Sequence, residues 1–347
     1  MAILLLLTLV GYAAGLVLPL CVPARPRVQN ILAHGLAGVA GVGGMCLGIT
    51  GLLAAEPFTM SVPSTLPLLT FAIRLDLLAS FFLLTISLVG LAASVFALGY
   101  VTEYYGRVSI SLIGSLFNGF LLSMTLVVIA DNGFFFLIVW ELMSLFSYFL
   151  VVTEHEKNDV RYAGLFYLIM THVGTAFILL TFLLLFQGSG SFSFEAFRQP
   201  EQPLPDGIRS MAFLTALIGF GTKAGIVPLH VWLPYAHPAA PSHVSALMSG
   251  VMIKTAIYAL IRVYFDFFGG QFPWWWGFVV LAIGAVSALL GVMYALMEHD
   301  LKSLLAYHSV ENIGIILLGI GAGMIFHSYG LEEMAALGLI AGLYHTI

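Results

Sequence analysis

Long apolar stretches separated by short polar connections dominate the pattern along this chain. Runs of spanning length begin near Ala2, Ile31, Leu75, Ser109, Gly133, Tyr162, Met211, His243, Trp274 and Ser303, and a shorter run begins near Met334. An α-helix needs about 20 apolar residues to cross a bilayer, and every run except the last meets that length. The pattern predicts an all-α polytopic membrane protein with eleven membrane helices. Because the eleventh run stops at Ile347 without a polar tail, we expect the chain to be a fragment.

The composition supports the membrane assignment and narrows the chemistry. Hydrophobic residues make up 61% of the chain and charged residues 8%, whereas about a quarter of a soluble domain is charged. A net charge of -5 argues against a nucleic-acid partner. Cys21 and Cys46 are too few for a cysteine-rich iron–sulfur or zinc site, so we expect neither cofactor nor metal. The first apolar run lacks a basic leader, so it is interpreted as a membrane helix and not a signal peptide.

Positive charges in the connections predict the orientation. One alternate set of connections holds Arg25, Arg27, Arg107, Lys157, Arg161 and Lys302. The opposite set holds Arg74, Arg198, Arg209 and Arg262. Because cytoplasmic connections carry the excess of lysine and arginine, the first set is predicted to be cytoplasmic and the N-terminus to lie outside.

Three charged residues interrupt the apolar runs: Glu141, Lys223 and Lys254. A lysine at the bilayer centre costs about 2.5–3.5 kcal/mol on insertion scales, so an idle one is not expected. Burial favours the neutral form of a lysine, and a nearby carboxylate favours the charged form. Moving Glu141 toward or away from Lys223 would therefore load or release a proton, which Lys254 could receive. The alternative is a structural ion pair that only neutralises charge.

The segment after Lys223 predicts a broken helix. It contains Pro228, Pro234, Pro238 and Pro241, interleaved with His230, His237 and His243. Proline prevents a straight helix from continuing, and a break at membrane depth needs protein or water to satisfy the freed backbone. Discontinuous helices mark ion sites in transporters. The alternative is an ordinary helix end followed by an interfacial loop. The neighbouring lysines favour the ion site. The histidine spacing fits no metal-ligand motif.

Further histidines are weaker candidates for a proton relay. His308 and Glu311 lie three residues apart and share a helical face. His172 interrupts another apolar run, and His345 lies near the end of the chain. A lone membrane histidine more often makes a hydrogen bond between helices. The three tryptophans at 274–276 predict an interfacial belt.

Three stretches resemble the antiporter-like subunits of respiratory complex I and of Mrp antiporters. They are residues 219–262, which contain GFGTKAGIVPLHVWLP, residues 140–153 around Glu141, and residues 298–315, which contain EHDLKSLLAYHSVENIG. Within that family, the sequence PYAHPAAPSHVSALMSGVMIKTA most resembles that of the large membrane subunit of formate-hydrogenlyase-type NiFe hydrogenases.

The resemblance implies a fold, a site and partners. The family folds as inverted five-helix repeats with broken helices. Residues 1–108 would then be N-terminal membrane helices, 109–266 the first repeat and 267–347 a truncated second repeat. Glu141 would pair with the pumping lysine Lys223, Lys254 would be the relay lysine, His308 a central relay residue and Lys302 the lysine of the family's DLK turn. The implied partners are other membrane subunits and a soluble NiFe hydrogenase and iron–sulfur arm, in a prokaryotic inner membrane.

Three functions therefore compete. The first is a subunit that moves protons, driven by redox chemistry in partner subunits, without a cofactor or catalytic centre of its own. The second is a subunit that exchanges sodium for protons with the same residues. The third is a membrane scaffold for soluble catalytic subunits, in which the charges are only packed ion pairs. A transporter of organic solutes is a remote fourth, since no recognisable solute cage is present.

Overall fold

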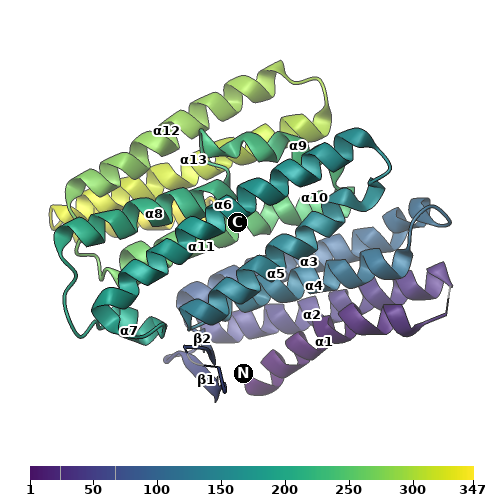
Figure 1. The fold of residues 1–347 in the computed structure, drawn as a ribbon, viewed down its shortest axis with the longest axis horizontal. Helices are drawn as coiled ribbons and strands as arrows, with labels where there is room; N and C mark the ends of the chain where they lie inside the picture. Colours follow the sequence, from purple (N-terminus) through teal and green to yellow (C-terminus); the bar gives the residue numbers. More distant parts are fainter. Residues whose placement is uncertain (24, 67) are drawn as a thin grey trace. The chain divides into compact units, whose positions relative to one another are not determined.

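Helices account for most of the chain in the computed structural model, which describes residues 1–23, 25–66 and 68–347 (Figure 1). Ten helices within those ranges are long and apolar enough to cross a membrane, which confirms the predicted class. The α-helices are α1 (Ala2–Cys21), α2 (Pro26–Leu52), α3 (Leu77–Tyr100), α4 (Ile110–Ile129), α5 (Gly133–Val151), α6 (Asn158–Ser189), α7 (Phe194–Arg198), α8 (Asp206–Ala224), α9 (Leu233–Ala239), α10 (Ser242–Leu247), α11 (Ile253–Ile261), α12 (Trp274–Met297), α13 (Leu301–Ser328) and α14 (Glu332–Tyr344). The shorter turns are η1 (Val101–Tyr104), η2 (Val152–Glu154) and η3 (Leu229–Trp232), and two segments are π-helical, η4 (Met248–Met252) and η5 (Arg262–Phe267).

Polar caps fix where several membrane helices begin. The Asp76 side chain accepts a hydrogen bond from the amide of Ala79 at the start of α3, and Asn132 does the same for α5. Asp300 accepts from the Ser303 amide at 2.8 Å, and this hydrogen bond lowers the pKa of Asp300. These side chains satisfy amides that a helix leaves without internal partners.

A β-hairpin precedes α3 and was not predicted. Strand β1 (Phe58–Pro63) pairs antiparallel with β2 (Thr70–Leu75), in the register Phe58↔Leu75. The sequence analysis placed the start of a membrane helix near Leu75, because the apolar residues of β2 run directly into those of α3. The Asp76 cap separates the two elements.

The chain divides into two compact units. The first contains Met1–Leu168 and Ala239–Thr255, and the second contains Ile169–Pro238 and Ala256–Ile347. In the first unit α2 packs against α1 and α3, and α4 packs against α1 and α5 (Figure 1). In the second unit α13 packs against both α12 and α14. The repeat boundaries at 109–266 and 267–347 stay a prediction.

Close packing of α12 on α13 depends on facing glycines. A Cβ atom added at Gly314 would lie 2.3 Å from the amide nitrogen of Ala288 and 2.6 Å from the carbonyl oxygen of Gly284. Gly277 and Gly321 face the partner backbone in the same way. Small residues let the backbones of membrane helices approach closely, and dispersion contacts then hold the pair together.

Gly314→Ala is expected to destabilise the protein by about 1–3 kcal/mol, because the added methyl group meets backbone and cannot be relieved by a side-chain rotation. Gly99→Ala is the matched control, since Gly99 lies in α3 with no atom within 4 Å of an added Cβ. That change should be neutral or stabilise by up to about 1 kcal/mol. Thermal unfolding of the detergent-solubilised protein measures both. Equal shifts would contradict close helix packing at Gly314.

One of the three tryptophans is not interfacial. Trp274 is exposed, but Trp276 is only 1% exposed. Its ring stacks on Phe213 of α8, with centroids 4.5 Å apart and an interplanar angle of 9°. The prediction of an interfacial belt is therefore wrong for Trp276, because the side chain turns into the second unit and packs there.

Candidate functional site

Lys223 lies at a helix end inside the protein. Its side chain is only 2% exposed, and it belongs to the last turn of α8. The carbonyl end of a helix carries partial negative charge, which favours a cation there. Gly225 ends the helix with a left-handed φ of 81°, and a Cβ at this position would lie 2.0 Å from Leu233 Cδ1. Only glycine meets both the conformation and the space.

The predicted break after Lys223 is present. The chain passes from α8 through Pro228 into η3 and then α9. Trp232 donates its indole N–H to the Thr222 carbonyl at 2.8 Å. The Val227 amide donates to Ser287 Oγ of α12 at 3.0 Å. The protein itself thus satisfies backbone groups that the break releases, as a non-helical segment at membrane depth requires.

Glu141 and Lys254 both belong to the first unit and are partly buried. Thr255 follows Lys254 in the chain, and Met143 lies two residues after Glu141 in α5. The Thr255 hydroxyl donates to the Met143 thioether at 3.8 Å. The α5 helix that carries Glu141 therefore packs against the segment that carries Lys254.

A buried tyrosine links the same two segments. The Tyr167 hydroxyl lies 2.6 Å from Ser147 Oγ of α5 and 3.6 Å from Met252 Sδ. Tyr167 also interacts electrostatically with Glu141. The ring thereby joins α5 to the residues just before Lys254, and its hydroxyl is a polar group between them.

A π-helical turn that the sequence pattern did not predict lies beside Lys254. Residues Met248–Met252 form η4, and Lys254 is the second residue of the α-helix that follows. A π-turn widens the helix and shifts the following side chains around the axis, and such turns are frequent at functional sites. The composition of this segment gives no signal for it, apart from Gly250.

Lys302 approaches the broken segment within the second unit. Its ammonium group donates to the carbonyl oxygen of Pro238 at 3.4 Å. His237 is buried and interacts electrostatically with Lys302. The DLK turn thus contacts the end of α9, which favours a positioning role for Lys302.

His308 and Glu311 form the hydrogen-bonded pair of α13. The distance from His308 Nδ1 to Glu311 Oε2 is 2.6 Å, and the His308 side chain is 46% exposed. Gly291 of α12 lets the two helices meet here, because a Cβ at Gly291 would lie 2.6 Å from the Glu311 amide nitrogen.

The remaining candidate histidines have different surroundings. His345 Nε2 lies 3.0 Å from Asn312 Oδ1, one residue after Glu311. The His230 ring centroid lies 6.4 Å from those of Tyr294 and Tyr307. His172 is exposed on α6. His243 is buried in the first unit, on α10.

The structure brings together only part of the predicted path. Glu141, Lys254 and His243 belong to the first unit. Lys223, His172, His230, His237, Lys302, His308, Glu311 and His345 belong to the second. The pairing of Glu141 with Lys223 and the transfer from Lys223 to Lys254 stay predictions.

The second unit contains a buried ion-pair network that the sequence pattern did not predict. Arg262 Nη1 lies 3.0 Å from Asp266 Oδ2, and Arg198 Nε lies 3.0 Å from the same oxygen. Arg262 also donates to the Tyr258 hydroxyl at 3.2 Å. Arg262 and Arg198 were predicted to be positive charges in connections, whereas the structure pairs both with Asp266 and pairs Arg198 also with Glu195 at 3.2 Å. The four-residue spacing of Arg262 and Asp266 was the available signal.

Comparison with known proteins places the chain in a family. The NADH:quinone oxidoreductase/Mrp antiporter transmembrane family matches residues 130–345, so the chain belongs to that family. The chain is 45% identical to hydrogenase-4 component B of Escherichia coli (strain K12), over 79% of this chain and 40% of the relative. It is 33% identical to formate hydrogenlyase subunit 3 of the same organism, over 92% of this chain and 50% of the relative. The chain thus spans about half or less of these relatives.

A solved structure has the same fold. The membrane-bound sulfane sulfur reductase, an archaeal respiratory membrane complex, contains a chain that superposes with a TM-score of 0.79 at 18% identity. The match covers 99% of this chain and 68% of that chain. The antiporter-like fold is therefore shown.

Proposed function

We propose that the chain is part of a proton-translocating membrane subunit in a redox-driven complex. Lys223 carries this proposal, because its ammonium group is buried at a helix break within an apolar span. Burial disfavours the charged form of a lysine, whereas the carbonyl end of α8 favours it. A lysine balanced between these effects binds and releases a proton when a neighbouring charge moves.

Glu141 supplies the moving or modulating charge, and Lys254 receives the proton. The packing of α5 against the segment around Lys254, through Met143 and Thr255, supports a functional connection between these two residues. The hydrogen-bonded pair of His308 and Glu311 continues the path on α13.

The partners we propose are other membrane subunits and a soluble arm with NiFe hydrogenase and iron–sulfur chemistry. Two relatives with hydrogenase or hydrogenlyase names support this assignment. We place the complex in a prokaryotic inner membrane with the N-terminus outside.

Exchange of sodium for protons is the second candidate function, because the matching family includes Mrp antiporters. The test uses vesicles that contain the intact complex. Uncoupler-sensitive proton uptake during redox turnover, in the absence of a sodium gradient, is expected. Proton movement that requires a sodium gradient but no electron transfer would favour the antiporter. Electron transfer without proton movement would contradict both transport functions and favour the membrane scaffold.

A further inference from the structure

Two buried histidines, His34 and the candidate residue His243, face each other in the first unit. His34 of α2 and His243 of α10 are each 1% exposed. Their ring centroids are 5.7 Å apart at an angle of 82°, so the edge of one ring meets the face of the other. Phe117 of α4 packs against both rings, at 5.1 Å and 5.3 Å. Burying an imidazole among apolar side chains costs free energy unless its nitrogen atoms are hydrogen-bonded.

Hydrogen bonds fix which nitrogen of His34 carries the proton. Asn30 donates its amide N–H groups to the Leu98 carbonyl and to the Tyr105 hydroxyl, both at 3.0 Å, so Asn30 Oδ1 is an acceptor. His34 Nδ1 lies 2.7 Å from that oxygen and 3.1 Å from the Asn30 carbonyl oxygen. Nδ1 therefore donates. Nε2 has no hydrogen-bond partner among the described residues and is the basic atom of the ring.

A row of hydroxyl groups leads from His243 toward the end of α3. The Tyr100 ring lies 5.6 Å from the His243 ring. The Tyr100 hydroxyl lies 3.3 Å from Ser242 Oγ and 3.4 Å from the Tyr104 hydroxyl. Tyr104 is in turn within hydrogen-bonding reach of the Glu154 carboxylate. Hydroxyl groups both donate and accept, so they pass a proton on while receiving another.

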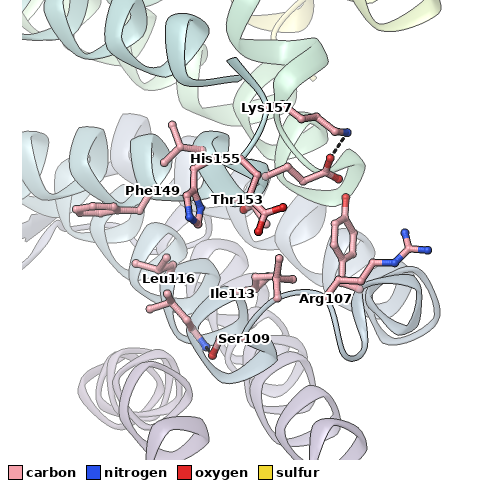
Figure 2. Close-up of a pocket in the computed structure, with 14 residues that line it drawn as sticks. Arg107, Ser109, Ile113, Leu116, Phe149, Thr153, His155 and Lys157 are labelled. Atoms are coloured by element: carbon pink, nitrogen blue, oxygen red, sulfur yellow. Dashed lines mark hydrogen bonds and ion pairs between the residues drawn. The ribbon is translucent and has the colours of Figure 1, made fainter. Parts of the chain in front are cut away.

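The row ends at a cavity. Tyr104 and Glu154 line a space of about 780 Å³ between the connections that follow α3 and α5. Figure 2 shows Phe149 and Leu116 on one side of it and Arg107 and Lys157 on the other. Lys157 forms an ion pair with Glu154. The cavity is large enough for many water molecules, and it meets the side of the chain where positive connections predict the cytoplasm.

We propose that His34 and His243 form a proton-holding site that is loaded from this cavity through Glu154, Tyr104, Tyr100 and Ser242. Glu154 takes a proton from a hydronium ion in the cavity, which leaves a neutral water molecule, and passes it to the Tyr104 hydroxyl. Each hydroxyl then accepts one proton and gives up its own, so only a positive charge moves and each hydroxyl regains its O–H bond. One imidazole nitrogen gains the proton. The pair holds one proton at a time, because two imidazolium ions 5.7 Å apart repel each other.

The site rests on the proposed function and extends it to the N-terminal helices. Ser242–Phe267 is one span, so the eleven residues from His243 to Lys254 correspond to a rise of roughly 16 Å. The histidine pair would thus hold protons on the entry side of Lys254. His34 also lies outside residues 130–345, which the family match covers.

The experiment measures proton uptake by vesicles that contain the intact complex during redox turnover. His34→Gln, His243→Gln and Tyr100→Phe are each expected to lower the rate roughly 10- to 100-fold, the range of a lost proton-transfer group. Tyr162→Phe is the matched control. It removes an exposed phenol hydroxyl of α6 that lies outside the row and the histidine pair, and it should stay within about twofold of wild type. The solvent deuterium isotope effect should rise in Tyr100→Phe, which altered packing alone would not cause.

The results for the Lys223 and histidine variants distinguish failure of the histidine site from failure of the proposed function. If proton uptake is lost in Lys223→Met but unchanged in assembled His34→Gln and His243→Gln, the histidine site is wrong and the function stands. If Lys223→Met is also unchanged, both are wrong. Should a histidine variant fail to assemble, Tyr100→Phe decides, because it deletes a single oxygen atom. An unchanged rate and isotope effect in that variant would overturn the site.

Discussion

Replacing Lys223 with methionine is expected to lower redox-driven proton uptake at least about 100-fold while the complex still assembles. Methionine is apolar and of similar length, so it occupies the buried end of α8 without leaving a large void. Only the group that binds the proton is lost. Proton uptake into vesicles and electron transfer in the same preparation measure the two effects separately.

Lys223→Arg tests the chemistry more sharply. Arginine keeps the positive charge at the carbonyl end of α8, but it does not release its proton in proteins. A pair that only neutralises charge would tolerate this change, whereas a site that must load and unload a proton would not. We therefore expect Lys223→Arg to lose proton uptake almost as fully as Lys223→Met.

Arg161→Met provides the control for the loss of a positive charge. The Arg161 side chain is exposed on α6, outside the proposed path, so its removal should alter uptake by no more than about twofold. Full proton uptake in Lys223→Met, with sensitivity to an uncoupler, would remove Lys223 from the path and make the scaffold the better function.

Much of the fold was predictable because the strongest signals in a membrane protein are local. Apolar run length predicted the membrane helices, and the prolines after Lys223 predicted the break. The hairpin was not predicted, since apolar residues continue from β2 into α3 and only Asp76 marks the boundary. The π-turns were not predicted either. An α-turn and a π-turn differ by one residue in hydrogen-bond register, and both accept the same apolar side chains.

The candidate site was predictable only where it depends on single residues. Lys223, Glu141 and Lys254 stand out because a charge inside an apolar run is rare. The contact of His34 with His243 joins positions about two hundred residues apart, and nothing near either position indicates the other. Asp266 was similarly hidden, because its second arginine, Arg198, comes from a separate short helix. Long-range pairing of this kind depends on packing, which the local pattern does not encode.

Asp266→Asn is expected to destabilise the protein by about 2–3 kcal/mol. The Arg262 and Arg198 side chains are 7% and 12% exposed, and both pair with this carboxylate, while Arg198 also pairs with Glu195 at 3.2 Å. Removing one partner of a buried ion pair strands the remaining charge, which costs about 3–5 kcal/mol when burial is complete. Asp266 is 28% exposed, so solvent screening reduces that cost. Thermal unfolding of the solubilised protein measures the change.

Asp206→Asn makes the same chemical change where it should have little effect. Asp206 pairs with Arg209 at 3.6 Å but is 99% exposed, so its loss should cost less than about 1 kcal/mol.

Adding Arg262→Met to Asp266→Asn should recover part of the stability, because it removes one stranded charge. The two single variants and the double variant then form a cycle that isolates the coupling between the two side chains. Additive effects would show that Arg262 does not depend on Asp266, and the ion-pair network would lose its stabilising role.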